Sequence, residues 1–480
     1  MINKNTVLLI VPPRIMNIDR DIGSDQLTPP GGLAYISGYL KSRGLNVAAI
    51  DAQAERLTPT GLAYRIRSCA PAVVGIGIHC SVQLSEAAAA ASVIKRFLPG
   101  TPVVVGGSHP SAVPENILEE NTCFDFAVCG EGEKTMYELS LRLLSHDSCE
   151  DVDGIAMRRK TGEIVVNPLR RYIEDLDSLP FPAFELFPLN KYKPYFKPAG
   201  KNLELPVTTA RGCPSRCFFC YQPMSENVRT RSVDNVMAEL HYLTGRFKIN
   251  QVLFTDDTFT LDQERIREFC ERMQKEGLHK KIRWLCASRV DIISQELLRI
   301  MRAAGCACVT YGVESGNQQI LDKIGKRISL AQARDAVRWT KEAGITADVN
   351  FILGLPYENE KTVRDSLNFI IELDPDFVNV ALLAVFPGTR AREMTQAGIG
   401  GLRFINKDWN KAGRIVGNMT ELEQLPRAKL EAYQTEAYMK FYLRPSKIGN
   451  LFKKVSWRSM LHYGRHQLHT LLPYFSRRIR

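Results

Sequence analysis

The sequence predicts an α/β protein with three parts: a doubly wound, Rossmann-like parallel sheet, a partial (β/α)6 barrel, and a helical, basic C-terminal region. Short continuous apolar runs alternate with helical stretches over most of the chain. Such runs are typical of parallel strands covered on both faces, and the alternation is typical of wound sheets and barrels. A segment rich in proline and aromatic residues interrupts the alternation at 146–203. We therefore expect a first domain over 1–145, a linker over 146–203, a second domain over 204–400, and a C-terminal region over 401–480.

The first domain alternates predicted strands with helices. The strands are expected at Thr6–Val11, Asn46–Asp51, Ala72–Ile78, Pro102–Val105 and Phe124–Val128, and the helices at Gly32–Ser42, Ser85–Phe97 and Glu133–Leu144. Ligands of doubly wound sheets bind at the carboxyl ends of the strands.

The loops at those ends are rich in glycine and small polar residues, which let a large ligand approach the backbone. No G-x-G-x-x-G run follows the first strand, so a dinucleotide is not favoured. The alternative is that the loops are only tight turns. The candidate binding residues are Ser81, Gly106, Gly107, His109, Gly130, Glu131 and Gly132.

The second domain repeats the alternation six times. Its strands are expected at Leu205–Thr209, Gln251–Thr255, Arg283–Ala287, Cys308–Val313, Ala347–Ile352 and Phe377–Val385. The helices between them are expected at Val233–Arg246, Leu261–Lys275, Gln295–Ala304, Leu330–Ala343 and Lys361–Leu373. Functional residues of such barrels lie on the loops that follow the strands.

Three cysteines, Cys213, Cys217 and Cys220, form a C-x3-C-x2-C motif on the first of these loops. Three thiolates can ligate three irons of a [4Fe–4S] cluster and leave the fourth iron free for a substrate or cofactor. A structural zinc site needs four ligands, and no second pair or histidine follows at a suitable distance. A disulfide framework is not expected in a chain this long without a signal peptide. The other cysteines are scattered, which favours a reducing, cytoplasmic location.

These motifs resemble the cobalamin (B12)-binding radical S-adenosylmethionine (SAM) enzymes, of the class B methyltransferase type, over roughly residues 1–400. The cysteine loop matches the family's C-x3-C-x-Φ-C motif, where Φ is aromatic and SAM chelates the free iron. The resemblance implies that Phe219, the aromatic residue of the motif, lies near the adenine. Plain core packing is the alternative for this side chain.

Three later loops also resemble family elements that bind SAM. Asp256 and Asp257 match a D-D-x-F element expected at the SAM amino group, although paired carboxylates can also cap the helix that follows. Arg289 could pair with the SAM carboxylate, with a surface salt bridge as the alternative. Glu314 stands in a G-V-E-S-G run, where the resemblance implies a contact with the ribose hydroxyls.

The runs Val103–Pro110 and Asp125–Glu133 resemble the family's cobalamin module, and they contain most of the candidate residues of the first domain. Many cobalamin proteins carry D-x-H-x-x-G, whose histidine ligates cobalt from below. The second predicted strand of this chain ends in Asp51–Glu55, without a histidine. The resemblance therefore implies cobalamin with its lower axial position empty or water-bound.

The basic charge is concentrated at the C-terminus. The ten lysines and arginines after Glu436 account for all but one unit of the net charge of +11, and no acidic residue follows Glu436. A basic helix with aromatic anchors over 437–480 could lie on a membrane surface, bind nucleic acid, or simply cap the barrel. Nucleic acid is the least expected of the three. No apolar run reaches the length of a membrane span.

The resemblance implies a C-methyltransferase that acts on an unactivated carbon of a small or lipid-like substrate. The cluster would cleave SAM reductively, the resulting 5′-deoxyadenosyl radical would abstract hydrogen, and methylcobalamin would supply the methyl group. An external electron donor of the flavodoxin or ferredoxin type is implied as well.

The motifs leave other activities open. The main alternative is an oxidative cyclase or rearrangement enzyme with the same cofactors. An RNA-modifying radical SAM enzyme is less expected, because the first domain has no second cysteine trio. A non-enzymatic metal-binding scaffold is the remaining alternative.

Overall fold

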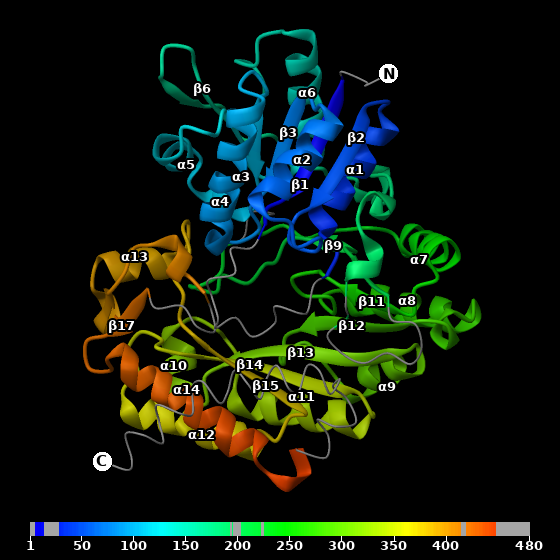
Figure 1. Ribbon diagram of the computed structural model, residues 1–480. Coiled ribbons are helices and arrows are strands. Elements are labelled where there is room, and N and C mark those ends of the chain that lie inside the picture. Colours follow the sequence, from blue (N-terminus) through cyan, green and yellow to red (C-terminus); the bar gives the residue numbers. More distant parts are fainter. Residues whose placement is uncertain are drawn as a thin grey trace.

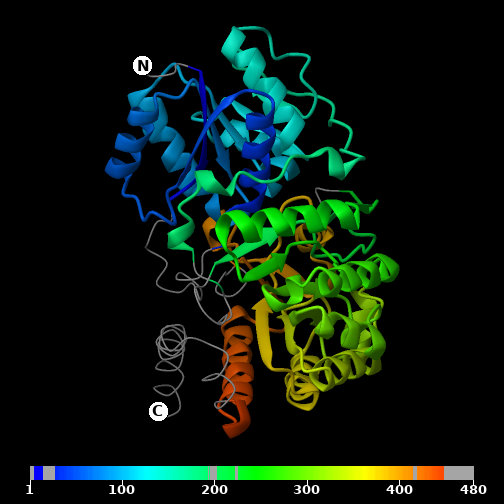
Figure 2. The same ribbon diagram turned by 90° about the vertical axis from the view of Figure 1, so that its right-hand side faces the viewer.

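The computed structural model describes residues 5–13, 28–192, 194, 203–221, 225–413 and 419–447. It contains two large sheets, of seven and six strands, which lie one above the other (Figures 1 and 2). The first sheet holds the N-terminal part of the chain and the second holds the barrel strands. The α/β fold class expected from the sequence is therefore confirmed.

The first sheet has the strand order β2-β1-β3-β4-β5-β6-β7. Strands β1 to β5 run parallel, at Thr6–Val11, Asn46–Asp51, Val73–Gly77, Val103–Gly106 and Phe126–Val128. The two strands that follow, β6 (Ile155–Arg158) and β7 (Ile164–Val166), are antiparallel and extend the same sheet. They lie within the range expected to be a linker, so that part of the chain belongs to the first sheet. The alternation of apolar residues there is too short to separate a hairpin from a loop.

Helices cover both faces of the first sheet. The faces alternate along β1: Val7 and Leu9 point to one core cluster, and Leu8 and Ile10 to the other. One face is covered by α1 (Gly31–Ser42) and α6 (Gly132–Ser145), the other by α2, α3 and α5, at Pro59–Cys69, Leu84–Phe97 and Pro114–Glu120. A short helix, α4 (Ser108–Ala112), follows β4 at the carboxyl edge.

The second sheet is entirely parallel, with the order β15-β14-β13-β12-β11-β8. In chain order its strands are Glu204–Val207, Gln251–Phe254, Arg283–Ser288, Cys306–Glu314, Thr346–Leu353 and Phe377–Leu382. The intervening helices are α7 to α12, at Val233–Phe247, Gln263–Lys275, Gln295–Ala303, Gln318–Lys323, Leu330–Glu342 and Glu360–Leu373. Because β8 and β15 do not pair, the barrel is open, as the partial (β/α)6 prediction expected.

The edge strand β15 is covered by α14 (Arg427–Tyr442), which crosses the lower part of the molecule in Figure 1. The Tyr442 hydroxyl accepts from Val378 N and donates to Val378 O, both at 3.0 Å. The Tyr438 hydroxyl accepts from Val380 N at 3.1 Å. Side chains of the helix thus satisfy backbone groups that an open edge would leave unpaired. The remaining elements of this region are α13 (Arg390–Gln396) and the hairpin β16–β17 (Leu402–Phe404 and Thr420–Leu422).

The segment between the sheets packs against both of them. Phe184, Phe187 and Tyr192 join the core of the second domain, and the Tyr192 hydroxyl donates to Asp51 at 2.7 Å. The proline- and aromatic-rich segment therefore packs across the boundary between the two domains. The exact domain limits stay a prediction.

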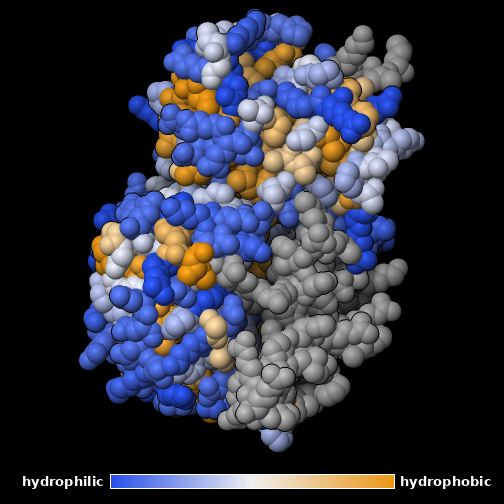
Figure 3. Space-filling view, turned by 60° about the vertical axis from the view of Figure 1, so that its left-hand side comes forward, coloured by the Kyte–Doolittle hydropathy of each residue, from blue (hydrophilic) through white to orange (hydrophobic). Residues whose placement is uncertain are grey.

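The predicted basic tail lies mostly outside the described residues, which end at Lys447. Among the helices that the structure describes, none combines the length and apolarity needed to span a bilayer. On the face shown in Figure 3, the second domain is largely hydrophilic, and apolar side chains appear in several places over the first domain.

Candidate functional site

A short hairpin closes the loop that carries the three cysteines. Strands β9 (Ala210–Arg211) and β10 (Arg229–Thr230) pair antiparallel, with Arg211 opposite Arg229. Gly212 follows with φ of +97°, and a Cβ atom there would lie 2.4 Å from the carbonyl oxygen of Asn227. Only glycine fits this turn. The hairpin therefore fixes where the cysteine loop leaves the barrel.

The three thiols share one electrostatic environment. Cys213 is buried, Cys217 is partly buried and Cys220 is reached by solvent. Desolvation by the surrounding protein, followed by the negative charges of Cys217, Asp257 and Cys213, raises the pKa of Cys220 to about 12. Three thiolates in this position repel one another, so the site fits a positively charged group held between them.

The kind of ligand atoms on the loop also indicates which positively charged group the three thiols could hold. Among the described residues, no three His, Cys, Asp or Glu side chains lie close enough together to hold a single metal ion. In a [4Fe–4S] cluster each thiolate ligates its own iron. The three thiols of the loop, Cys213, Cys217 and Cys220, are the donors that such a cluster uses.

A buried cation lies beside Cys217. Lys326 is 6% exposed and donates to Glu314 Oε1 at 2.8 Å, and its ammonium lies 5.9 Å from the centre of the Phe219 ring. Burial is the largest single influence on Lys326 and opposes its charge, but the negative charges of Glu314 and Cys217 together raise the pKa of the lysine. Burial raises the pKa of Cys217, Lys326 and Arg289 act to lower it, and Glu314 acts to raise it. These groups therefore surround one thiol.

Arg289 is held in place by two acceptors. Its guanidinium forms a bidentate ion pair with Asp291, at 2.9 and 2.8 Å, and donates to the Lys326 carbonyl at 3.1 Å. The structure thus brings Arg289 to the cysteine loop, but with its own carboxylate partner. Lys326 was not expected from the sequence, because a lone lysine in a turn after a short helix carries no periodic signal.

The backbone at Glu314 is strained. Glu314 is the last residue of β13 and has φ of +73°, next to a register shift between Gly312 and Glu314. A Cβ atom on Gly312 would lie 2.4 Å from Glu314 Oε1, so the glycine makes room for the carboxylate. Strain of this kind is often found where a side chain is aimed at a ligand.

The paired aspartates after β11 separate into two roles. Asp256 is buried and accepts from Thr209 N at 2.6 Å and from the Thr209 hydroxyl. Its carboxylate ties β11 to the segment that leads into the cysteine hairpin. Asp257 is exposed, and its charge acts on Cys220. Neither residue caps the following helix, whose N-cap is Asp262.

At the carboxyl edge of the first sheet, two predicted residues lie together. His109 Nδ1 lies 2.8 Å from Ser81 Oγ, and the ring meets Trp409 edge to face, with 5.0 Å between centroids. The guanidinium of Arg392 lies over the Trp409 ring, with its central carbon 4.5 Å from the ring centroid. Burial and then the charge of Arg392 lower the pKa of His109 to about 4, so the imidazole is neutral.

The four candidate glycines at this edge differ in the space and backbone conformation around the missing Cβ. Gly107 has φ of +119°, and a Cβ there would lie 2.3 Å from Ile78 O, so packing within the sheet requires it. Gly130 has φ of +76° with open space around the missing Cβ. Gly106 would meet only ordinary contacts with Val128, and Gly132 would meet the flexible Ile36 side chain. Gly130 is therefore the glycine best suited to a ligand's approach.

Glu131 meets arginines of the cysteine hairpin. Its Oε1 accepts from Arg211 at 2.8 Å and from Arg229 at 2.9 Å, and its Oε2 accepts from Ile173 N at 2.6 Å. Neither arginine was expected from the sequence to take part in the site. The complementary G-E-G-E run and the arginines that flank the cysteines were the available signal.

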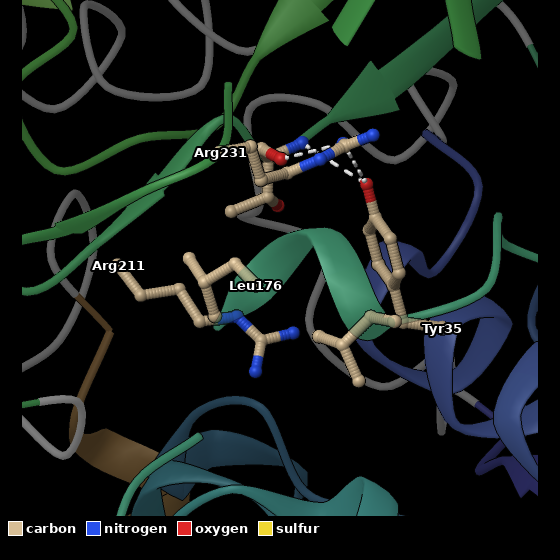
Figure 4. Close-up of a pocket in the computed structure, with 6 residues that line it drawn as sticks. Tyr35, Leu176, Arg211 and Arg231 are labelled. Carbon is tan, nitrogen blue, oxygen red and sulfur yellow. Dashed lines mark hydrogen bonds between the residues drawn. The ribbon is translucent and has the colours of Figure 1, made fainter. Parts of the chain in front are cut away.

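A small cavity of about 10 Å³, room for about one water centre, lies next to this contact (Figure 4). It is lined by Tyr35, Leu176, Leu179, Thr208, Arg211 and Arg231. The space between α1 and the hairpin is thus nearly filled.

Two family models match the chain. The Radical SAM superfamily matches residues 207–370, and the B12 binding domain matches residues 23–140. These ranges lie within the parts of the chain that form the second and the first sheet, respectively.

Individual relatives cover more of the chain. It is 33% identical over 441 residues to an uncharacterized methyltransferase of Pyrococcus horikoshii, a match that spans 92% of this chain and 93% of that protein. It is 30% identical to the anaerobic magnesium-protoporphyrin IX monomethyl ester cyclase of Rubrivivax gelatinosus, over 75% of this chain and 65% of that protein.

A solved structure shares the two-domain fold. The radical S-adenosylmethionine methyltransferase TsrM from Kitasatospora setae, solved with cobalamin and a [4Fe–4S] cluster bound, superposes with a TM-score of 0.72. The superposition covers 90% of this chain and 91% of that chain at 19% sequence identity.

Proposed function

The chain belongs to the B12-binding radical SAM enzymes, and on that premise we propose that it is a methyltransferase that acts on an unactivated carbon. The observation that carries the proposal is the grouping of Lys326, Glu314 and Arg289 around Cys217, on the loop whose motif holds the family's cluster. When bound, the cluster and SAM supply radical chemistry, and cobalamin supplies the methyl group.

We propose that Cys213, Cys217 and Cys220 ligate the cluster and that the charged groups around Cys217 bind SAM. The two cations, Lys326 and Arg289, are suited to pair with the carboxylate of SAM. The Lys326 ammonium lies 5.9 Å from the centre of the Phe219 ring. Glu314 is the acceptor for ribose hydroxyls, and its strained backbone supports that role.

Asp257 is the better candidate of the two aspartates for the SAM amino group. Its carboxylate is exposed beside Cys220, whereas Asp256 is occupied by Thr209. Asp256 instead positions the strand that leads to the hairpin.

For cobalamin we propose the carboxyl edge of the first sheet, where the candidate residues are Ser81, His109, Gly106, Gly107, Gly130 and Gly132. The neutral His109 and its Ser81 partner offer hydrogen bonds without an added charge. Glu131 serves this site through the arginines that it holds.

The substrate is a small molecule, and the enzyme needs an external reductant. We propose a lipid-like or other apolar substrate and a donor of the flavodoxin or ferredoxin type. Contact of residues 437–480 with a membrane surface stays a prediction, because most of that range lies outside the described residues.

The proposal is tested with anaerobically reconstituted protein. The unaltered chain is expected to bind about four irons per chain and, with a reductant, to convert SAM to 5′-deoxyadenosine. Cys217→Ala should lose both properties. Cys69→Ala, at the end of α2 in the first domain, removes a comparable thiol and should keep them. Equal SAM cleavage by Cys217→Ala and the unaltered chain would contradict the assignment.

A cyclase activity is the second candidate, because the Rubrivivax cyclase is 30% identical over three quarters of this chain. Methyl transfer consumes a second SAM and releases S-adenosylhomocysteine. A cyclase would form 5′-deoxyadenosine without it.

A further inference from the structure

Three arginines attach the cysteine hairpin to the first domain. Arg211 ends β9, two residues before Cys213. On the other side of the loop, Arg229 begins β10 and Arg231 directly follows its last residue. Cys213 N donates to Ser225 O at 3.2 Å, and Arg231 N donates to Thr209 O at 2.9 Å. A shift of the hairpin therefore moves the first cluster cysteine directly.

Two carboxylates of the first domain hold the first two arginines. Glu131 and Glu133 stand at the start of α6, directly after the loop that follows β5. Glu133 accepts from Arg211 Nη2 at 2.5 Å, and Glu131 accepts from both Arg211 and Arg229. The side chains of all four residues are at most 10% exposed. Separating them would leave buried charges without partners.

The third arginine is held from the neighbouring helix. The Tyr35 hydroxyl on α1 accepts from Arg231 Nη1 at 3.3 Å (Figure 4). The same hydroxyl donates to Glu239 on α7, which forms a buried ion pair with Arg231. Arg231 also donates to Thr208 O at 3.0 Å. Side chains of α1 and α6, two helices that pack together on one face of the first sheet, thus contact the arginines at the hairpin.

The contacts leave little freedom. Buried bonds to charged groups are strong because the interior screens them poorly. The cavity between Tyr35 and Arg211 is too small to admit a rearranged side chain. The first domain and the cysteine loop are therefore held as one body at this point.

We propose that this arginine clamp, formed by Arg211, Arg229, Arg231, Glu131, Glu133 and Tyr35, sets the position of the cluster loop relative to the B12-binding edge, so that hydrogen abstraction and methyl transfer reach the same substrate carbon. The six residues are positioning residues. That the clamp fixes the cysteine loop follows from the contacts alone. That this placement serves hydrogen abstraction and methyl transfer rests on the proposed methyltransferase function.

The structural part is tested on the full-length protein without cofactors, by hydrogen–deuterium exchange of the amides in residues 210–213 and 229–231. Tyr35→Phe removes one hydroxyl and keeps the ion pairs. Glu133→Gln removes one charge and keeps an acceptor. Both should speed exchange at the hairpin, Glu133→Gln by about tenfold or more. The matched control is Glu138→Gln, on the same helix, which pairs with Arg170 away from the hairpin. Unchanged exchange in both clamp variants would overturn the proposal.

The functional part is tested on reconstituted protein by the ratio of methylated product to 5′-deoxyadenosine. The clamp variants should still form 5′-deoxyadenosine but yield several-fold less product per molecule of it. The double variant Glu133→Gln with Arg211→Gln makes both partners neutral, while Arg229 remains paired with Glu131, and it should recover part of the ratio. Faster exchange with an unchanged product ratio would show a purely structural contact and overturn the positioning role. If the unaltered chain methylates nothing, the proposed function fails while the exchange result still stands.

Discussion

Replacing Lys326 by methionine separates two functions of one buried ion pair. The Lys326 ammonium and the Glu314 carboxylate are 2.8 Å apart, with side chains 7% and 8% exposed. Removing the lysine leaves the buried Glu314 carboxylate without its ion-pair partner, which costs about 3–5 kcal/mol of folding free energy. On the proposed SAM site, the variant also removes a charge-assisted hydrogen bond to the SAM carboxylate, of about 1.5–3 kcal/mol. The loss corresponds to a SAM dissociation constant about 10- to 150-fold higher.

The double variant Glu314→Gln with Lys326→Met distinguishes these effects. It leaves no unpaired charge, so thermal stability should recover most of the loss, whereas SAM affinity should stay low. Stability is read from thermal unfolding, and affinity from equilibrium binding of SAM to the reconstituted protein. Lys323→Met is the matched control, because Lys323 is exposed and lies over Tyr357 instead. The reasoning is refuted if Lys326→Met binds SAM as tightly as the unaltered chain.

Three further predictions concern the fold around the site. Glu358 is buried, and burial, opposed by donors from Leu355 and Gly354, raises its pKa to about 8. Stability from the neutral acid is full below about pH 4.5 and is lost as pH rises toward 8, by up to about 1.4 kcal/mol per pH unit. Glu358→Gln should flatten that slope in urea unfolding, and an unchanged slope would contradict the assignment. Gly107→Ala should destabilise the first domain by at least about 2 kcal/mol, because its backbone conformation and Ile78 O exclude a Cβ. Gly100→Ala, where no atom lies near the added Cβ, should leave the stability unchanged. Equal melting temperatures of the Gly107→Ala and Gly100→Ala variants would count against the reasoning. Tyr442→Phe should cost about 1–2 kcal/mol, by loss of its bonds to Val378, and exposed Tyr64→Phe should cost nothing measurable by denaturant midpoint.

The sequence predicted the parallel strands well because most of them are built around a short run of apolar residues. Both sheets, and the open barrel, follow from such runs. The hairpin β6–β7 was missed because its strands are four and three residues long and carry no distinct period. The helix α14 was expected only as an unspecified part of the helical C-terminal region 401–480, and its role as a cover for β15 depends on tyrosine hydroxyls that reach backbone atoms.

The site was predictable only where a local motif marks it. The cysteine spacing locates the loop, and the D-D, S-R-V-D and G-V-E-S-G runs place carboxylates and an arginine at strand ends. Lys326 and the clamp arginines could not be predicted in the same way, because each gains its role from a partner far away in the sequence. Glu131 shows the converse: a residue of a ligand-binding loop whose carboxylate is taken up by two arginines.

The most direct test of the central claim uses SAM with a deuterated methyl group. The reconstituted, reduced protein is incubated with cobalamin and fractionated candidate substrates, and the products are analysed by mass spectrometry. We expect 5′-deoxyadenosine and S-adenosylhomocysteine to form together, with a product that carries the labelled methyl group on carbon. Formation of 5′-deoxyadenosine with a changed substrate, but with neither S-adenosylhomocysteine nor a labelled product, would contradict the claim.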